Sequence, residues 1–312
     1  MTDTTSGKYD VIIAAYNNEA YIEAALRSVF QSSVQPSRVI VVDDASSDNT
    51  PEIAASFDRV EVLQNEQNQE RSTTRNRGVE ASDADYIQFL DADDLLHPEK
   101  TKHQIQILEK NPKVDVAVGD VWLFHDGQWP GEKRTYPADI DFLRQLIRKN
   151  IFALHSLLFR KSFFERFGNF DPALPIGEDR ELYIRSFVNG ANWIYTPGAE
   201  GYYRQHQSGT IRSRQYDSAY FNAVAIRRHR HDLAEIADGR YRKLTADSLR
   251  TLARNANMVL RPMDEVAQLI SESSEIHHSP TLPQNRIYHW MEKLLGSVIF
   301  ERLLRLRFLL GR

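Results

Sequence analysis

The alternation of short β-branched runs with helical stretches over the first 120 residues is what most constrains the fold of this chain. The runs are brief and apolar almost throughout, as expected of strands that are covered on both faces. Strand followed by helix, repeated, is the pattern of βαβ units around a mainly parallel sheet flanked by helices. We therefore expect an α/β fold, with strands at 9–15, 38–43, 60–64, 86–90 and 114–121 and helices at 19–32, 51–57, 71–81 and 98–110.

The rhythm changes beyond the last of these strands, where glycines and prolines predict a loop. The elements predicted after this loop are a helix at 140–149 and strands at 156–160, 192–196 and 201–204. The remainder of the chain is predicted to be mostly helical. The sequence thus predicts an α/β domain over residues 1–212 and a helical C-terminal extension over 213–312.

Composition excludes several kinds of site and partner. The chain has 39 Lys and Arg against 43 Asp and Glu, and this formal charge of −4 gives no overall field that would attract nucleic acid. It has no cysteine, which rules out disulfides and thiolate metal sites. A bound metal must therefore be held by carboxylate, imidazole or phosphate groups.

No segment of the sequence resembles a membrane span or a leader. Residues 1–8 are polar and lack the apolar centre of a signal peptide, and no run approaches the roughly 18 apolar residues that a span needs. We expect a cytoplasmic protein that touches a membrane only peripherally, at its inner face.

Acidic residues follow the ends of two predicted strands. Asp43 and Asp44 end the second strand, and a carboxylate there can accept the imide N–H of a base or a ribose hydroxyl. The alternative is a turn or helix cap, where Asp is favoured anyway. Asp91 and Asp93 follow the strand at 86–90, and residues two apart in an extended segment point the same way. Because two like charges side by side are costly, a divalent cation that also holds a diphosphate would compensate them, although such a triplet also occurs by chance.

A third acidic pair, Glu178 and Asp179, begins an apparent helix. Carboxylates at a helix N-terminus are stabilised by the helix dipole, so capping alone explains the pair. The functional interpretation makes Asp179 a general base that removes the proton of an attacking hydroxyl.

In their order and spacing these motifs resemble the family 2 glycosyltransferases, which have the GT-A fold with a Rossmann-like central sheet. The matching segments span about residues 8–210: Val-Ile-Ile-Ala-Ala-Tyr-Asn-Asn-Glu at 11–19, Val-Val-Asp-Asp-Ala-Ser-Ser-Asp-Asn-Thr at 41–50, Thr-Arg-Asn-Arg-Gly at 74–78, Phe-Leu-Asp-Ala-Asp-Asp at 89–94, Phe-Asp at 170–171, Gly-Glu-Asp-Arg-Glu-Leu at 177–182 and Tyr-Arg-Gln-His at 203–206. The chain departs from relatives at Ala14, where they usually have Pro, and at Ala45 and Asn169, where they usually have Gly. None of these departures removes a carboxylate or the histidine.

The resemblance implies a role for each matching residue. Asp179 would be the catalytic base, and Asp93 and His206 would hold a divalent metal, Mn²⁺ or Mg²⁺. The residues implied in nucleotide binding are Ala15, Tyr16, Glu19, Asp43, Asp44, Arg71, Arg75, Asn76, Asp91 and Ala92. Residues 1–120 would form the nucleotide-sugar half of the domain and 121–212 the acceptor half.

The implied reaction is an inverting, metal-dependent transfer of a sugar from a nucleotide-sugar donor to a hydroxyl of a saccharide or lipid-linked acceptor, in polysaccharide biosynthesis at the cell envelope. The carboxylates favour a base that carries an imide N–H, so uridine diphosphate is the first choice of donor nucleotide. Thymidine and guanosine diphosphate are left open. One alternative is a non-catalytic nucleotide-sugar binder of the same fold. A nucleotidyltransferase is disfavoured because residues 14–19 hold neither the glycines nor the lysine of its loop.

Two further segments suit binding partners. Aromatic residues between 122 and 177 suit a saccharide acceptor, although an ordinary core explains most of them: Trp122, Phe124, Trp129, Phe152 and His155. The tail at 288–312 interleaves apolar and basic residues at helical spacing, which suits contact with an anionic membrane. Packing on its own domain, or on a second copy in a homodimer, is the alternative.

Overall fold

The computed structural model describes residues 7–148, 152–205, 224–258, 263–276, 298 and 302. The chain divides into two compact units. The first comprises Met1–Phe142, Ile151–Pro175 and Asn189–Gly209, and the second comprises Leu143–Asn150, Ile176–Val188 and Thr210–Arg312. Two segments that precede residue 212 therefore group with the C-terminal helices, while the predicted domain boundary at 212 stays a prediction.

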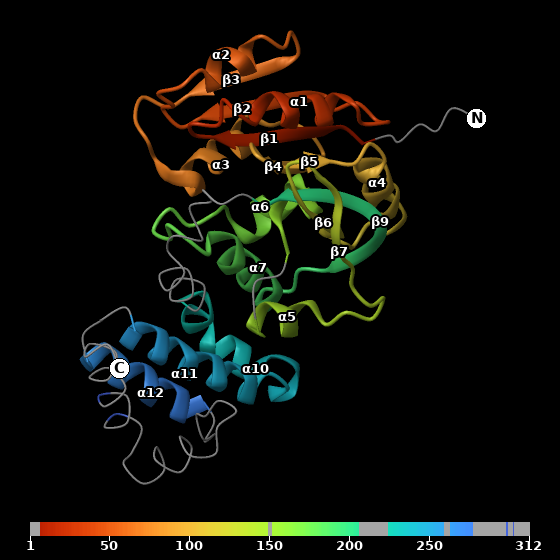
Figure 1. Cartoon of the computed structure of the whole chain (residues 1–312). Helices are drawn as coiled ribbons and strands as arrows, with labels where there is room; N and C mark the ends of the chain where they lie inside the picture. The colour runs from red at the N-terminus through yellow and green to blue at the C-terminus, as the bar shows by residue number, and fades with distance from the viewer. Residues whose placement is uncertain are drawn as a thin grey trace. The chain divides into compact units, whose positions relative to one another are not determined.

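The first half of the first unit is a parallel sheet, in the order β3-β2-β1-β4 (Figure 1). Its strands are β1 (Tyr9–Ala15), β2 (Arg38–Asp43), β3 (Val60–Gln64) and β4 (Tyr86–Asp91), joined by α1 (Ile22–Phe30), α2 (Thr50–Ala55) and α3 (Glu70–Ala81). The central strands are buried along nearly their whole length, as the unalternating apolar runs predict. Residues of β1, β2 and α1 form one apolar cluster, including Val11, Ile13, Val39, Val41, Ala25, Leu26 and Val29.

Beyond β4 the sheet is mixed and curled. It continues in the order β4-β8-β6-β9-β5, and β7 pairs with β6. The elements of this part are β5 (Leu95–Leu96), α4 (Lys100–Lys110), β6 (Val116–His125), β7 (Gln128–Arg134), η1 (Leu154–Ser156), β8 (Leu157–Arg160), α6 (Lys161–Phe167) and β9 (Trp193–Arg204). Three strands stand between β4 and β5 in the sheet, yet only residues 92–94 separate them in the chain. Since each residue spans at most about 3.6 Å, the sheet has to curl until its far edge meets the end of β4.

The expected α/β fold, a central sheet flanked by helices, is confirmed. The strands of the β3-β2-β1-β4 half are parallel to one another, and β6 is parallel to β9. Strands β8, β7 and β5 each pair antiparallel with their neighbours. The two runs predicted at 192–196 and 201–204 form the single strand β9, whose register with β6 shifts between Val118 and Asp120.

The predicted helix at 19–32 begins only at Ile22. The preceding residues are held as a loop, because Asn17 has a φ of 52° and its N–H donates to the Ser46 hydroxyl oxygen at 2.9 Å. The Asn17 side-chain oxygen in turn accepts the N–H of Ser47 at 2.8 Å. The loop after β1 is thus bonded to the loop after β2 instead of continuing the helix.

The second unit is helical in its described parts. Its helices are α5 (Phe142–Arg148, of which residues 143–148 belong to this unit), α7 (Glu178–Val188), α10 (Arg230–Gly239), α11 (Arg242–Met258) and α12 (Met263–Ile276). An apolar cluster from α11 and α12, with Leu249, Leu252, Val266 and Leu269, forms its core. Among the described residues, no helix is both long and apolar enough to cross a membrane. The predicted amphipathic tail at 288–312 lies outside the described residues except for Val298 and Arg302.

The substitution Ala45→Gly is expected to stabilise the protein. Ala45 has a φ of 62°, and this left-handed conformation costs a residue with a Cβ roughly 1–2 kcal/mol. The greater freedom of glycine in the unfolded chain offsets about 0.4–1 kcal/mol of that gain. We expect a net increase of about 0.5–1 kcal/mol in the free energy of unfolding, measured by urea denaturation.

The matched control is Ala55→Gly, at the exposed last residue of α2. There glycine is expected to destabilise the helix by up to about 1 kcal/mol. Equal effects of the two substitutions would contradict the strain that we assign to Ala45.

Candidate functional site

The carboxyl ends of β1, β2 and β4 meet at one edge of the sheet. The register pairs Ala15 with Asp43 across β1 and β2, and Ala14 with Asp91 across β1 and β4. In open α/β sheets ligands bind outside this edge. The structure therefore brings together the residues that the sequence predicts after the first, second and fourth strands.

The loop after β1 combines a structural residue with an exposed aromatic ring. Glu19 Oε2 accepts the backbone N–H of Asn49 at 3.1 Å and its side-chain amide at 2.9 Å. The N–H of Glu19 donates to Asp48 Oδ2 at 3.0 Å, so Glu19 holds this loop against the loop after β2. Tyr16 is 50% exposed, which leaves its ring accessible to a planar ligand.

Asp43 and Asp44 are both buried, but their oxygens are used differently. Asp44 Oδ1 accepts the side-chain amide of Asn65 at 2.7 Å and the N–H of Gln69 at 2.9 Å, which fixes the approach to α3. Asp43 Oδ2 accepts the N–H of Ser46 at 3.2 Å, while its Oδ1 is buried without a hydrogen-bond donor among the described residues. Because an unsatisfied buried carboxylate oxygen is costly, Asp43 is the better placed of the two to accept a ligand N–H or hydroxyl.

Helix α3 supplies a cation and an anchor. The guanidinium of Arg75, a side chain 8% exposed, donates to Asp91 Oδ1 at 2.8 Å. Asn76 donates to the carbonyl of Phe170 at 2.8 Å and accepts the N–H of Phe170 at 3.0 Å, so it fixes the Phe-Asp segment. A Cβ on Gly78 would lie 2.4 Å from Ile12 Cγ2, so glycine lets α3 pack closely on β1. Contacts of Arg75, Asn76 and Arg71 with a nucleotide stay predictions.

The loop from Asp91 to Asp94 concentrates three carboxylates in four residues. Burial favours the neutral form of Asp91, but Arg75, His155 and Arg71 together hold its pKa below the usual value. Burial raises the pKa of Asp94 to about 6, although His155 lowers it. The charges of Asp93 and Asp91 add to the rise. The protein's own cations thus favour the charged form of Asp91, whereas burial disfavours the charged form of Asp94. Ala92, between the acids, is buried in the apolar cluster.

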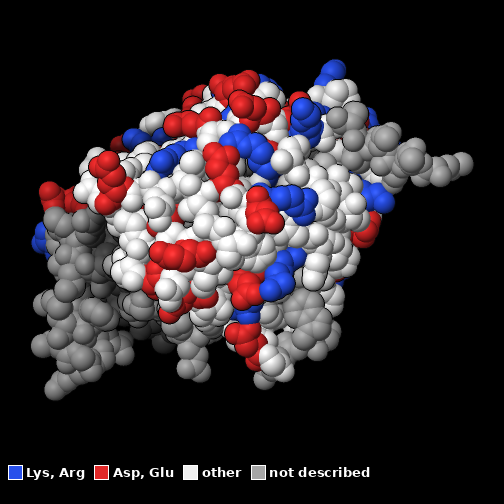
Figure 2. Space-filling view, turned by 90° about the horizontal axis from the view of Figure 1, so that it is seen from above, with Lys and Arg blue, Asp and Glu red and all other residues white. Residues whose placement is uncertain are grey.

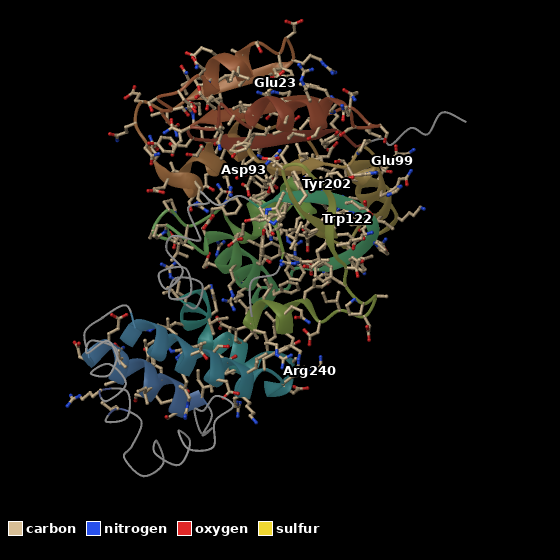
Figure 3. All side chains as sticks on the ribbon, viewed as in Figure 1. Glu23, Asp93, Glu99, Trp122, Tyr202 and Arg240 are labelled. Atoms are coloured by element: carbon tan, nitrogen blue, oxygen red, sulfur yellow. The ribbon has the colours of Figure 1, made fainter. Side chains whose placement is uncertain are left out.

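The donor set suits an open metal site. Among the described residues no three His, Asp or Glu side chains are grouped as a complete metal cage. Mg²⁺ is usually held by one or two carboxylates together with substrate phosphates. The acids of 91–94 can provide the carboxylates. Figure 3 shows Asp93 between the parallel strands and the β6 and β9 pair that carries Trp122 and Tyr202. The predicted ligand His206 lies outside the described residues.

Asp179 lies in the first turn of α7, in the second unit. Its Oδ1 accepts the N–H of Arg180 at 2.6 Å. Arg180 donates to the carbonyls of Leu146 and Ile147 at 2.8 and 2.9 Å, which fixes α7 against the end of α5. The assignment of Asp179 as a base stays a prediction.

The aromatic residues expected near the acceptor are mostly core. Phe124, Phe152 and His155 are buried, whereas Trp122 is half-buried and donates to Glu200 Oε2 at 2.9 Å. The side chain of Trp129 lies outside the described residues. The face of the first unit seen in Figure 2, which carries α1 and α2, shows acidic and basic side chains interspersed.

Two residues at the acidic loop were not assigned to it from the sequence, where Arg204 was not singled out and His155 was placed among the aromatic residues near the acceptor. Arg204 donates from Nε to the carbonyl of Asp93 at 2.8 Å, and His155 Nδ1 lies 2.8 Å from Asp94 Oδ2. Arg204 belongs to the Tyr-Arg-Gln-His motif, but only His206 was singled out there. No local pattern points to a partner 111 residues away.

The chain is similar in sequence to known proteins. A family model described as glycosyl transferase family 2 matches residues 10–168. An uncharacterized glycosyltransferase of Haemophilus influenzae is 30% identical over 184 residues, which are 56% of this chain and 60% of that protein. The succinoglycan biosynthesis protein ExoO of Rhizobium meliloti is 29% identical over 213 residues, which are 64% of this chain and 61% of that protein. The matches thus span less than two thirds of these relatives.

Two solved structures share the fold. The S. aureus TarS fragment 1–349 in complex with UDP-GlcNAc has a TM-score of 0.64 at 17% identity, covering 98% of this chain and 92% of that one. The mannosyltransferase PcManGT from Pyrobaculum calidifontis, in complex with GDP-Man and Mn²⁺, has a TM-score of 0.60 at 18% identity, covering 97% and 88%. The resemblance in structure confirms the GT-A architecture.

The acid stability of the second unit should depend on Glu181 of α7. Burial opposes its ionisation, but hydrogen bonds and charge from His229 and Arg185 lower the pKa of Glu181 to about 2. A depressed carboxyl pKa stabilises the fold above the unfolded value of about 4.3, and this stabilisation is lost as the pH falls towards 2. Between pH 5 and 2, the free energy of unfolding should fall about 2 kcal/mol less in Glu181→Gln than in the unsubstituted protein.

Glu235→Gln is the control, because Glu235 is exposed on α10. Its acid titration, followed by urea denaturation at each pH, should match that of the unsubstituted protein. Parallel pH profiles for Glu181→Gln and the unsubstituted protein would show that the α7 ion pairs do not stabilise the unit.

Proposed function

Because the chain belongs to glycosyl transferase family 2, we propose that it transfers a sugar, with inversion, from a nucleoside-diphosphate sugar to an acceptor hydroxyl with the help of a divalent cation. The observation that carries this proposal is the convergence of two acidic strand ends, those of β2 and β4, on one edge of the sheet beside the end of β1. Such an edge binds nucleotides in open α/β folds, and its acids suit a cation-bound diphosphate.

The nucleoside end of the donor is assigned to the loops after β1 and β2. The exposed ring of Tyr16 offers a stacking surface for a base, and Asp43 Oδ1 offers a buried acceptor for an imide N–H or a ribose hydroxyl. Uracil carries such an imide, so uridine diphosphate is our first choice of donor nucleotide. Guanine carries a comparable N–H, and thymidine diphosphate shares the imide of uracil.

The diphosphate end is assigned to the loop 91–94. Asp93, together with His206, would hold Mn²⁺ or Mg²⁺, while Asp91, balanced by Arg75, would face the ribose. When bound, the cation stabilises the negative charge that gathers on the leaving diphosphate, which replaces a general acid. One similar structure, PcManGT, was solved with GDP-Man and Mn²⁺, which supports a donor site that uses a cation.

The acceptor side is assigned to the second half of the α/β domain and to α7. Asp179 would remove the proton of the acceptor hydroxyl as that oxygen attacks the sugar carbon opposite the leaving group. A single displacement of this kind inverts the anomeric centre. The relative ExoO is a succinoglycan biosynthesis protein, which supports a saccharide acceptor, free or lipid-linked, in polysaccharide synthesis.

The cation requirement predicts metal-dependent binding of a nucleoside diphosphate. A ligand that binds only the folded protein raises its melting temperature, so UDP, GDP and dTDP are each screened by thermal shift with and without Mn²⁺. We expect one of them, UDP first, to stabilise the protein only with Mn²⁺, and Asp93→Asn to abolish the shift.

Asp83→Asn provides the matched control, because Asp83 is exposed just before β4, at the opposite edge of the sheet. It should keep the full shift. An unchanged Mn²⁺-dependent shift in Asp93→Asn would remove Asp93 from the cation site.

The base assignment predicts a separation of binding from turnover. Asp179→Asn keeps the size of the side chain and removes its basicity, so donor binding should stay within about twofold. Transfer should fall roughly 10²–10⁴-fold, the usual contribution of general base catalysis. Release of the nucleoside diphosphate from its sugar, with acceptor present, measures the transfer.

Asp232→Asn serves as the control in the same unit, because its side chain is 64% exposed on α10. It should keep full activity. Comparable turnover in Asp179→Asn and Asp232→Asn would overturn the assignment of the base.

A further inference from the structure

We propose that Arg204 is a positioning residue, which fixes the main chain of the acidic loop 91–94 so that the Asp93 carboxylate stays where the donor's cation binds. The effect on cation binding rests on the proposed function, whereas the contacts of Arg204 with the loop do not depend on any ligand. Arg204 is the last residue of β9, and it lies two residues before His206.

Two hydrogen bonds join Arg204 to the acidic loop. Its backbone N–H donates to Asp94 Oδ1 at 2.8 Å, and its side-chain Nε donates to the carbonyl of Asp93 at 2.8 Å. The main chain and the side chain of one residue thus hold two consecutive loop residues. A loop residue held at its carbonyl has a fixed main chain, and this fixes the point from which its side chain extends.

The guanidinium itself is held from several sides. Its carbon lies 4.7 Å from the ring centroid of Phe124 and 5.2 Å from that of Tyr21, and Nη1 pairs with the Asp126 carboxylate. The Arg204 side chain is only 8% exposed. Ring stacking and an ion pair of this kind pre-organise a planar guanidinium, which a lysine cannot reproduce.

The opposite oxygen of Asp94 meets a second buried group. His155 Nδ1 lies 2.8 Å from Asp94 Oδ2, and both side chains are at most 2% exposed. The His155 ring stacks on Tyr203, with 6.1 Å between centroids and 23° between planes. Gly201 leaves the room for this ring, because a Cβ there would lie 2.4 Å from His155 Cδ2. Asp94 is therefore held between β9 and His155, and it serves as the anchor of the loop.

Because the link between β4 and β5 is short, anchoring Asp94 also fixes the position of Asp93. Only residues 92–94 join the parallel half of the sheet to the strand paired with β9, and the N–H of Asp94 bonds back to the carbonyl of Asp91 at 3.0 Å. A shift of β9 relative to β4 would therefore displace these residues. Metal ligands need positions held within about 0.5 Å, so a contact that fixes the loop also sets the affinity for the cation.

Arg160 offers a matched comparison. It too donates to backbone carbonyls, of Val114 at 2.7 Å and Leu108 at 2.6 Å, and its guanidinium lies 5.4 Å from the centroid of the Tyr86 ring. Its strand, β8, pairs with the amino end of β4, away from the acidic loop. Replacing either arginine by methionine removes similar interactions and keeps much of the apolar stem.

The test compares Arg204→Met, Arg204→Lys and Arg160→Met with the unsubstituted protein. Hydrogen exchange of peptides covering residues 89–96 reports on the loop, calorimetry reports on Mn²⁺ binding in the presence of UDP, and thermal melting reports on stability. We expect faster exchange at 89–96 and a roughly 10–100-fold weaker affinity for Mn²⁺ in Arg204→Met, as is typical when a supporting partner of a metal ligand is lost. Arg204→Lys should recover only part of the affinity. Arg160→Met should lower the melting temperature about as much as Arg204→Met does. It should change neither the exchange at 89–96 nor the affinity for Mn²⁺.

Unchanged exchange at 89–96 in Arg204→Met would overturn the positioning role, as would equal losses of Mn²⁺ affinity in Arg204→Met and Arg160→Met. Failure of the unsubstituted protein to bind Mn²⁺ with UDP, or with the diphosphate that the screen selects, would instead count against the proposed function. In that case the exchange measurement still decides whether Arg204 holds the loop.

Discussion

The structure depends on the way three neighbouring carboxylates are held on the link that closes the curled sheet. Arg75 balances Asp91 from α3, and Asp94 is buried between Arg204 and His155. The charged form of Asp91 is thus favoured by its partners, whereas burial disfavours the charged form of Asp94. Asp93 stands between them, on a main chain that is fixed from both sides, and this is the arrangement that a carboxylate needs if it is to meet a cation in a constant position.

The rest of the edge is built by hydrogen bonds between loops. Glu19 joins the first two loops, Asp44 holds the segment before α3, and Asn76 holds the backbone of Phe170. Much of the motif pattern therefore specifies the shape of the loops, and fewer groups remain to meet a ligand. The exposed ring of Tyr16 and the buried Oδ1 of Asp43 are two of these groups, and they lie in the loops where a base would be expected.

The parallel half of the sheet could be predicted from the sequence because its signals are local. Short, largely apolar runs define β1 to β4, and the common direction of these strands places Asp43 and Asp91 at one edge. The curl could not be predicted in this way, because β4 pairs with β8 and β6 with β9 across more than 60 residues. The same separation hid Arg204 and His155, whose partners at Asp93 and Asp94 become neighbours only when the far edge of the sheet returns.

Anomalous diffraction from crystals grown with Mn²⁺ and UDP, or the diphosphate that proves to bind, tests the cation site most directly. We expect a single Mn²⁺ peak at coordination distance from an Asp93 carboxylate oxygen and beside the diphosphate, with the nucleoside in the loops after β1 and β2. A diphosphate bound elsewhere, or a Mn²⁺ peak that Asp93 does not touch, would contradict it.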